Sequence, residues 1–303
     1  MVGREGRQID PQDSVLAELW RAPYTISRPR QQTSPFVFAS PHSGKLYPAR
    51  FVAESRLTPL ALRRSEDAFV DELFAAVAPL GAPLIAARFP RAFVDPNRAA
   101  RELDRTMFDD ALAMEVDAGS ARVAAGLGVI PRIVRDGAEI YRGKLAPADA
   151  EERLNRLYRP YHRALAELVE ETRTRFGVAV VVDCHSMPSA ANVPDIVLGD
   201  RYGASASPGL MRFAERAFQA CGFSVARNAP YAGGHTTDLY GRRDKDIHAL
   251  QIEVNRALYL DEERIERGAH FETVREKLAG ALAHLTALGA NALHAAPPPL
   301  AAE

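Results

Sequence analysis

Histidines at the ends of apolar segments are the residues of this chain that could most readily do chemistry. His42 lies in Ser-Pro-His-Ser-Gly and His185 in Asp-Cys-His-Ser, and each segment directly follows a short apolar run. Imidazole nitrogen and carboxylate oxygen bind borderline divalent metals such as zinc, and a catalytic zinc site has three protein ligands and one open position. Two histidines and one carboxylate would therefore form a site suited to metal-assisted hydrolysis. Each histidine taken alone is equally compatible with a loop residue bonded to the backbone.

The carboxylate has several candidates in the run Glu66-Asp67-Ala68-Phe69-Val70-Asp71. Asp67 and Asp71 are four residues apart, so they would share one face of a helix. Acidic side chains in a first helical turn also complement the helix dipole without binding anything. These carboxylates become candidate ligands only in combination with the two histidines.

Arginines in the segment Phe89–Arg98 could bind an anionic group. Asp95, Asn97 and Arg98 cluster there beyond a short apolar run, and Arg91 precedes them. The planar guanidinium matches the geometry of a carboxylate, so arginines near a metal site indicate an anionic substrate. A purely structural Arg–Asp pair would leave the same pattern.

Glu253 and His235 are candidates for proton transfer and charge stabilisation. Alternation along the strand predicted at 247–254 puts Gln251, Glu253 and Asn255 on one face. A carboxylate facing inward is costly unless it is paired or lies near a cation, so Glu253 is either a general base or the partner of a nearby arginine. His235 lies in the glycine-containing segment 233–238, predicted to be a flexible loop, where it could stabilise an oxyanion or simply face solvent.

The elements that must position these residues alternate between strands and helices. Strands are predicted at 36–40, 83–88, 92–95, 178–183, 195–198 and 247–254, and helices at 65–80, 147–175 with a kink or break at Pro160, 208–220 and 261–288. This order indicates an α/β fold with a mainly parallel or mixed central sheet covered by helices on both faces. Ligands bind beyond the carboxyl ends of such strands, where His42 and His185 are expected.

The chain is predicted to contain one catalytic domain at 35–289. A surface arm at 1–34 precedes this domain, and a flexible tail at 290–303 follows it. A net charge of −1 does not indicate a protein that binds nucleic acid, and no apolar stretch is long enough to span a bilayer. Two cysteines and no signal-like start favour the reducing cytoplasm. Cys184 should face away from His185 and pack in the core rather than act as a nucleophile.

In their order along the chain, these motifs resemble the N-formylglutamate amidohydrolase family. The matching segments are Ser-Pro-His-Ser-Gly, the acidic helix around Asp67, Val-Asp-Pro-Asn-Arg, Asp-Cys-His-Ser, Gly-His-Thr and Gln-Ile-Glu-Val-Asn-Arg, between about residues 35 and 265. The family is similar in fold and mechanism to zinc carboxypeptidases and to the succinylglutamate desuccinylase and aspartoacylase group. The resemblance therefore implies a zinc carboxypeptidase-like fold.

The resemblance also implies roles for individual residues. His42, Asp67 and His185 would bind Zn²⁺ or another divalent metal, with Glu66 and Asp71 as alternatives to Asp67. The His-x-x-Glu spacing of the carboxypeptidase relatives would place a glutamate at position 45, where this chain has Lys45. Glu253 would be the base, Arg91 or His235 would stabilise the oxyanion, and the substrate would be bound by Ser43, Asn97, Arg98 and Thr236.

The implied reaction is hydrolysis of a small anionic N-acyl amino acid, N-formyl-L-glutamate, to L-glutamate and formate, a step of histidine degradation. A carboxypeptidase, a deacylase for another N-acyl amino acid or peptide, and a non-catalytic metal-binding or ligand-binding protein remain alternatives. The oligomeric state is not predicted.

Overall fold

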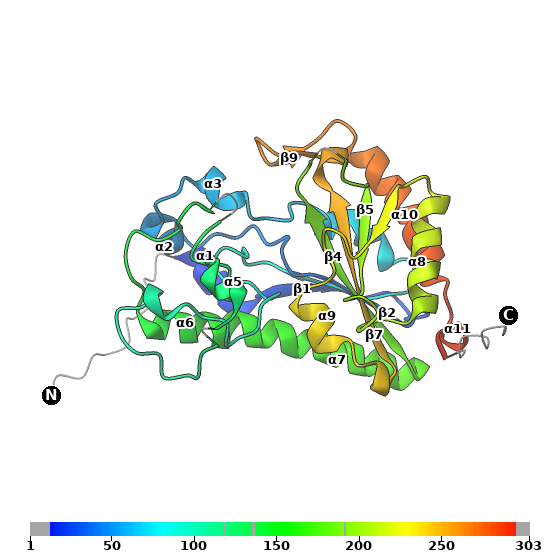
Figure 1. The fold of residues 1–303 in the computed structure, drawn as a ribbon, viewed down its shortest axis with the longest axis horizontal. Coiled ribbons are helices and arrows are strands. Elements are labelled where there is room, and N and C mark those ends of the chain that lie inside the picture. Colours follow the sequence, from blue (N-terminus) through cyan, green and yellow to red (C-terminus); the bar gives the residue numbers. More distant parts are fainter. Residues whose placement is uncertain (1–12, 118, 135–136, 191, 295–303) are drawn as a thin grey trace.

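One central sheet organises the chain. The computed structural model describes residues 13–117, 119–134, 137–190 and 192–294. Its seven-stranded sheet has the order β1-β3-β2-β4-β7-β5-β6 (Figure 1). The strands are β1 (Tyr24–Ser27), β2 (Phe36–Ser40), β3 (Leu84–Ala87), β4 (Ala179–Met187), β5 (Ile196–Gly199), β6 (Val225–Arg227) and β7 (Ile247–Asn255).

The sheet is mixed, which confirms the predicted α/β class. Its central strands β3, β2, β4 and β7 are mutually parallel, whereas β1 pairs antiparallel with β3 and β5 pairs antiparallel with β7. The edge strand β1 comes from the segment predicted to be an arm, of which residues 1–12 lie outside the described residues.

Helices cover both faces of this sheet (Figure 1). They are α1 (Ser14–Arg21), α2 (Ala49–Glu54), α3 (Pro59–Arg63), α4 (Val70–Leu73), α5 (Ala121–Ala124), α6 (Pro147–Arg153), α7 (Arg159–Phe176), α8 (Pro208–Ala220), α9 (His235–Tyr240), α10 (Phe271–Thr286) and α11 (Ala290–His294). None of the described helices is both long and apolar enough to cross a membrane. The predicted tail begins with α11, and residues 295–303 lie outside the described part.

The alternation of side chains along the central strands creates two cores. Val37 and Val181 join the core that includes the buried face of α7, whereas Phe38 and Val182 join the core that includes α8 and α10. Cys184 is fully buried in the second core, on the face opposite His185, which confirms that it is a packing residue. Asp183, His185 and Glu253 therefore share the α7 side of the sheet.

Two predicted helices differ in the structure. The segment 65–80 does not form one helix, because Phe69 has a left-handed φ of 64° and only α4 and a short 3₁₀ turn at Ala75–Val77 follow it. Helix α10 begins ten residues later than predicted, at Phe271, since the preceding residues form the small hairpin β8 (Leu260–Asp261) and β9 (Glu266–Arg267). The predicted strand at 92–95 is a turn.

The long helical segment before β4 is interrupted where Pro160 predicts a break. Helix α6 leads into a π-helical turn at Leu154–Tyr158, and α7 starts at Arg159 with Pro160 in its first turn. Proline has no backbone N–H to donate and its ring crowds the preceding turn of a regular helix, and the wider π turn lies directly before it. Helix α7 then packs along β2 and β4 and supports the strands that carry the site.

Candidate active site

Three of the predicted site residues lie at the carboxyl ends of three adjacent parallel strands. His42 follows β2, His185 lies near the end of β4, and Glu253 lies near the end of β7, directly beside His185 in the strand register. These strand ends form the floor of a cavity of about 470 Å³. Side chains of the cavity wall include Arg64, Asp67, Arg91, Asp95, Asn97, Arg98, Arg122, Ser186, Tyr231, Gln251 and Arg256.

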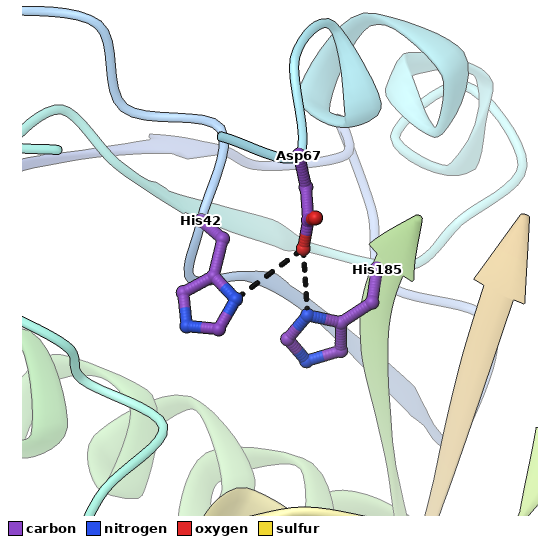
Figure 2. Close-up of side chains that lie close together, drawn as sticks. All are labelled: His42, Asp67 and His185. Atoms are coloured by element: carbon purple, nitrogen blue, oxygen red, sulfur yellow. Dashed lines mark hydrogen bonds and ion pairs between the residues drawn. The ribbon is translucent and has the colours of Figure 1, made fainter. Parts of the chain in front are cut away.

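Three donor atoms face one another at the floor of the cavity (Figure 2). Asp67 Oδ2 lies 2.9 Å from His185 Nδ1 and 3.3 Å from His42 Nδ1. The ligand atoms of the three residues all lie within 4.8 Å of one another. Each of the three residues is at most 3% exposed. Among the described residues, this is the one group of acidic, histidine or cysteine side chains arranged to hold a metal ion.

The far side of each imidazole is held by a second carboxylate. His42 Nε2 lies 2.7 Å from Asp95 Oδ1, and His185 Nε2 lies 2.9 Å from Asp183 Oδ2. With a metal ion bound, an Nε2–H donated to these carboxylates would leave the Nδ1 lone pair of each ring available to the ion that Asp67 Oδ2 also binds. Such carboxylate–histidine pairs orient metal-binding histidines and raise their basicity.

The charges of the site are also compatible with the binding of a cation. Burial opposes the ionisation of Asp67, but hydrogen bonds with His185 and His42 hold its pKa well below the usual range. Burial likewise disfavours a charged His185, yet Asp183 and the hydrogen bonds of the ring raise its pKa well above the usual value. A proton on His185 thus supplies positive charge among buried carboxylates. A divalent cation bound by the three donor atoms would supply the same charge, so the site fits such an ion.

Glu253 is buried beside this donor group. Its Oε1 accepts a hydrogen bond of 2.6 Å from Gln251 Nε2. Burial raises the pKa of Glu253 to about 8; His185 opposes the shift, and Asp67 adds to it. A cation among the donor atoms would favour the ionised form, which is the form that can accept a proton.

Arg98 and Arg91 both line the cavity but differ in how their charge is compensated. Arg91 forms an ion pair of 2.8 Å with Asp95. Arg98 donates instead to two backbone carbonyls, at 3.0 Å to Leu127 and 2.7 Å to Asn97, and forms no ion pair with any described carboxylate. Burial lowers the pKa of Arg98. Arg98 is therefore a rigidly held cation available to an anionic ligand.

Three residues predicted for the site stand behind the cavity wall rather than in it. The hydroxyl of Ser43 is hydrogen-bonded to Ser40 Oγ at 2.8 Å. The backbone N–H and hydroxyl of Thr236 donate to Asn97 Oδ1 at 2.8 and 3.0 Å. His235 begins helix α9, not a flexible loop, and its Nε2 lies 3.3 Å from the hydroxyl of Tyr158. Thr236 therefore contacts the site through Asn97.

Asn97 bridges two sides of the cavity. Its Nδ2 lies 3.0 Å from both Asp183 Oδ2 and His185 Nε2, and its Oδ1 is held by Thr236. A side chain at Gly234 would meet the Asn97 amide at 2.6 to 2.9 Å, so the close approach of this loop requires glycine. Asn97 thus ties the first turn of α9 to the support of His185.

The alternatives to Asp67 are oriented elsewhere. The carboxylate of Glu66 is buried against Arg63 and the hydroxyl of Tyr47, with contacts of 3.0 and 2.8 Å. Asp71 lies half-buried on α4, and neither residue belongs to the donor group. The left-handed turn at Phe69 explains the difference, because it separates Asp67 from α4 and from the face that Asp71 occupies.

Four residues around the donor group and Glu253 were not among those predicted from the sequence to form the site: Asp183, which supports His185, and the cavity residues Ser186, Gln251 and Arg256. Strand parity carried a signal for two of them. Asp183 is two residues from His185 and Gln251 is two residues from Glu253, so each shares a face with a predicted residue. Arg256 lies beyond the end of β7, where no periodicity applies.

Comparisons with known proteins place these observations in a family. The family model described as N-formylglutamate amidohydrolase matches residues 34–260. An N-formylglutamate deformylase of Pseudomonas aeruginosa is 32% identical over 243 residues, which cover 76% of this chain and 83% of the relative. The protein of the same name from Pseudomonas putida is 30% identical over 241 residues, covering 75% and 82%.

Solved structures agree with these matches. The crystal structure of an N-formylglutamate amidohydrolase from Ralstonia eutropha JMP134 has a TM-score of 0.82 and 37% identity, covering 88% of this chain and 97% of that one. A gene product of Agrobacterium tumefaciens shares the fold at 18% identity, with a TM-score of 0.62 and coverage of 88% and 96%.

Proposed function

Because this chain belongs to the N-formylglutamate amidohydrolase family, we propose that it hydrolyses N-formyl-L-glutamate to formate and L-glutamate. The observation that carries the proposal is the buried donor group of His42, Asp67 and His185 beside Glu253, at the floor of a cavity that also presents Arg98. These features suit the hydrolysis of an anionic amide. The donor group can hold a metal, Glu253 can move a proton, and Arg98 can bind the negative charge of the substrate.

His42, Asp67 and His185 are the proposed ligands of a divalent ion, with zinc the ion that best suits two imidazoles and one carboxylate. When bound, such an ion supplies Lewis-acid catalysis and lowers the pKa of water. Asp95 and Asp183 keep the two imidazoles in the orientation that presents Nδ1.

Glu253 is the proposed general base and acid. Its carboxylate takes a proton from the attacking water as the water oxygen forms a bond to the formyl carbon. The C–N bond then breaks, and Glu253 returns the proton to the leaving nitrogen, which releases formate and the amino acid. Arg91, which lines the same cavity, is the proposed cation that stabilises negative charge on the formyl oxygen.

Arg98 is the proposed anchor for a substrate carboxylate. Its guanidinium is fixed by Leu127 and Asn97 and forms no ion pair with a carboxylate among the residues that the structure describes, so a substrate carboxylate would complete its hydrogen bonding. Asn97 remains part of the proposed site in a supporting role, since its amide contacts Asp183, His185 and Thr236. Ser43, Thr236 and His235 are not proposed to touch the substrate.

A substrate panel tests the proposed specificity. Formate and amino-acid release are measured with N-formyl-L-glutamate, N-formyl-L-aspartate, N-acetyl-L-glutamate and a dipeptide that ends in glutamate. We expect the highest kcat/KM for N-formyl-L-glutamate. A higher kcat/KM for the acetyl compound would make the protein a deacylase of another specificity, and preference for the dipeptide would make it a carboxypeptidase.

A further inference from the structure

The two oxygens of Asp67 have different surroundings. Oδ2 faces the two imidazoles, at 2.9 Å from His185 and 3.3 Å from His42. Oδ1 points away from them (Figure 2) and accepts hydrogen bonds from Arg256 Nη2 at 2.8 Å and from Ser186 Oγ at 3.1 Å. A carboxylate whose one oxygen is held by two donors can present only the other oxygen to a third group.

Arg256 is itself held on several sides. It opens the 3₁₀ turn at Arg256–Leu258 after β7, and its side chain is 6% exposed. Its Nε donates to Ser186 Oγ at 3.0 Å, and its Nη2 also donates to the backbone carbonyl of Glu66 at 2.7 Å. Since Ser186 accepts from Arg256, its single proton is free to go to Asp67. Both donors to Asp67 Oδ1 are thus accounted for, one N–H of Arg256 and the hydroxyl of Ser186.

The charge of Arg256 is directed at Asp67 rather than at the cavity. Arg256 and Arg98 both line the cavity, but Arg98 forms no ion pair with a described carboxylate, whereas Arg256 is paired with Asp67 at 2.8 Å. Two of its three nitrogens are already engaged, and the third, Nη1, lies 3.9 Å from Glu262. A substrate carboxylate would have to compete with all of these partners.

We propose that Arg256, acting with Ser186, is a positioning residue that fixes the carboxylate of Asp67 so that only Oδ2 is offered to the metal ion. The inference rests on the metal site of the proposed function and adds an outer group to it. Residues that orient a metal ligand typically change metal affinity by 10- to 100-fold when they are replaced. Arg256 should thus set how tightly the site holds its ion without touching that ion.

The test is the zinc affinity of the full-length protein, measured by competition with a chromophoric chelator. We expect the zinc Kd of Arg256→Met to rise about 10- to 100-fold. Arg256→Lys keeps the charge but can reach fewer of the three partners, so its Kd should lie between those of the wild type and Arg256→Met. Ser186→Ala should raise the Kd about 3- to 10-fold, as expected for the loss of one typical hydrogen bond while Arg256 still donates to Asp67 Oδ1.

A matched control separates positioning from loss of a buried arginine. Arg153 is as buried as Arg256, but it packs over the ring of Phe93 and donates to the hydroxyl of Tyr141, away from the donor group. Arg153→Met should lower the Tm of the metal-free protein yet leave its zinc Kd unchanged. With Co²⁺ in place of zinc, the visible absorption spectrum should change in Arg256→Met and not in Arg153→Met.

Two failures can be told apart. If the wild-type protein takes up no zinc or cobalt, the proposed metal site itself is wrong. If the wild type binds zinc and both Arg256→Lys and Ser186→Ala bind it with a Kd within twofold of wild type, the positioning role is wrong and the metal site stands. The second comparison holds even if Arg256→Met fails to fold.

Discussion

Replacing Glu253 by glutamine should abolish most of the activity while leaving the metal site intact. The two side chains are isosteric, and the 2.6 Å hydrogen bond from Gln251 Nε2 can still be accepted by the amide oxygen. Glu253 is not one of the three donor residues, so zinc binding should persist. The amide cannot take up a proton, and general base catalysis contributes about 10²- to 10⁴-fold. This loss corresponds to about 2.7–5.5 kcal/mol of transition-state stabilisation.

The assay is formate release at saturating N-formyl-L-glutamate, with zinc content measured on the same sample. Glu66→Gln is the matched control, because Glu66 is equally buried but interacts with Arg63 and Tyr47 outside the donor group. That control should keep both zinc and turnover. A Glu253→Gln variant with turnover within tenfold of the wild type would refute the assignment of Glu253 as the base.

Three further predictions concern the surroundings of the site. Arg98→Met should lower kcat/KM about 10- to 100-fold, mainly through KM, because a charged hydrogen bond to the substrate is lost; an unchanged KM would remove Arg98 as the anchor. Gly234→Ala should reduce turnover at least tenfold, since its Cβ would lie 2.6 Å from the Asn97 amide; wild-type kinetics would show that Asn97 need not stay in place. Burial lowers the pKa of His162 to about 4, so its neutral form is favoured in the folded state. The stabilisation that neutral His162 contributes is complete above pH 6.5 and is lost as the pH falls towards 4, by up to about 3 kcal/mol. His162→Gln should therefore reduce the pH dependence of the free energy of unfolding in urea over this range. The same pH dependence in the wild type and the variant would contradict this prediction.

Much of the site could be predicted from strand parity alone. His185 and Glu253 lie on parallel strands whose apolar runs end together, and the pairing of β4 with β7 puts them side by side. The same rule assigned Cys184 to the opposite core. These relations depend only on the two-residue repeat of a strand, which the sequence displays directly.

The position of Asp67 could not be predicted in the same way. Its orientation depends on the left-handed turn at Phe69, which long-range hydrogen bonds brace: Arg256 donates to the Glu66 carbonyl, and Tyr259 donates to the Ala68 carbonyl at 3.1 Å. Local helix propensity favours one helix across this segment, and contacts almost two hundred residues away override it. The same limitation hid the contacts of Arg256 with Glu66 and Asp67.

The interiors of helical segments were easier to predict than their ends. Helix α8 follows local signals and is confirmed, and a π-helical turn lies directly before the position where Pro160 predicts a kink or a break. The last helix is predicted to begin at residue 261, but residues 261–270 precede it, and Asp261 accepts hydrogen bonds from the backbone N–H groups of Glu263 and Arg264 within the β8–β9 turn. The two glycines before His235 predict a flexible loop, whereas helix α9 begins at His235.

The most direct test of the proposed function is the metal content of the protein measured together with its formate release, in the wild type and in Asp67→Asn. Asparagine keeps the shape of Asp67 but removes the charge that the donor group needs. We predict one tightly bound divalent ion per wild-type chain and formate release from N-formyl-L-glutamate, with both lost in folded Asp67→Asn and in a chelator-treated wild type. A metal-free protein that still releases formate at the wild-type rate would contradict a metal-dependent reaction at His42, Asp67 and His185.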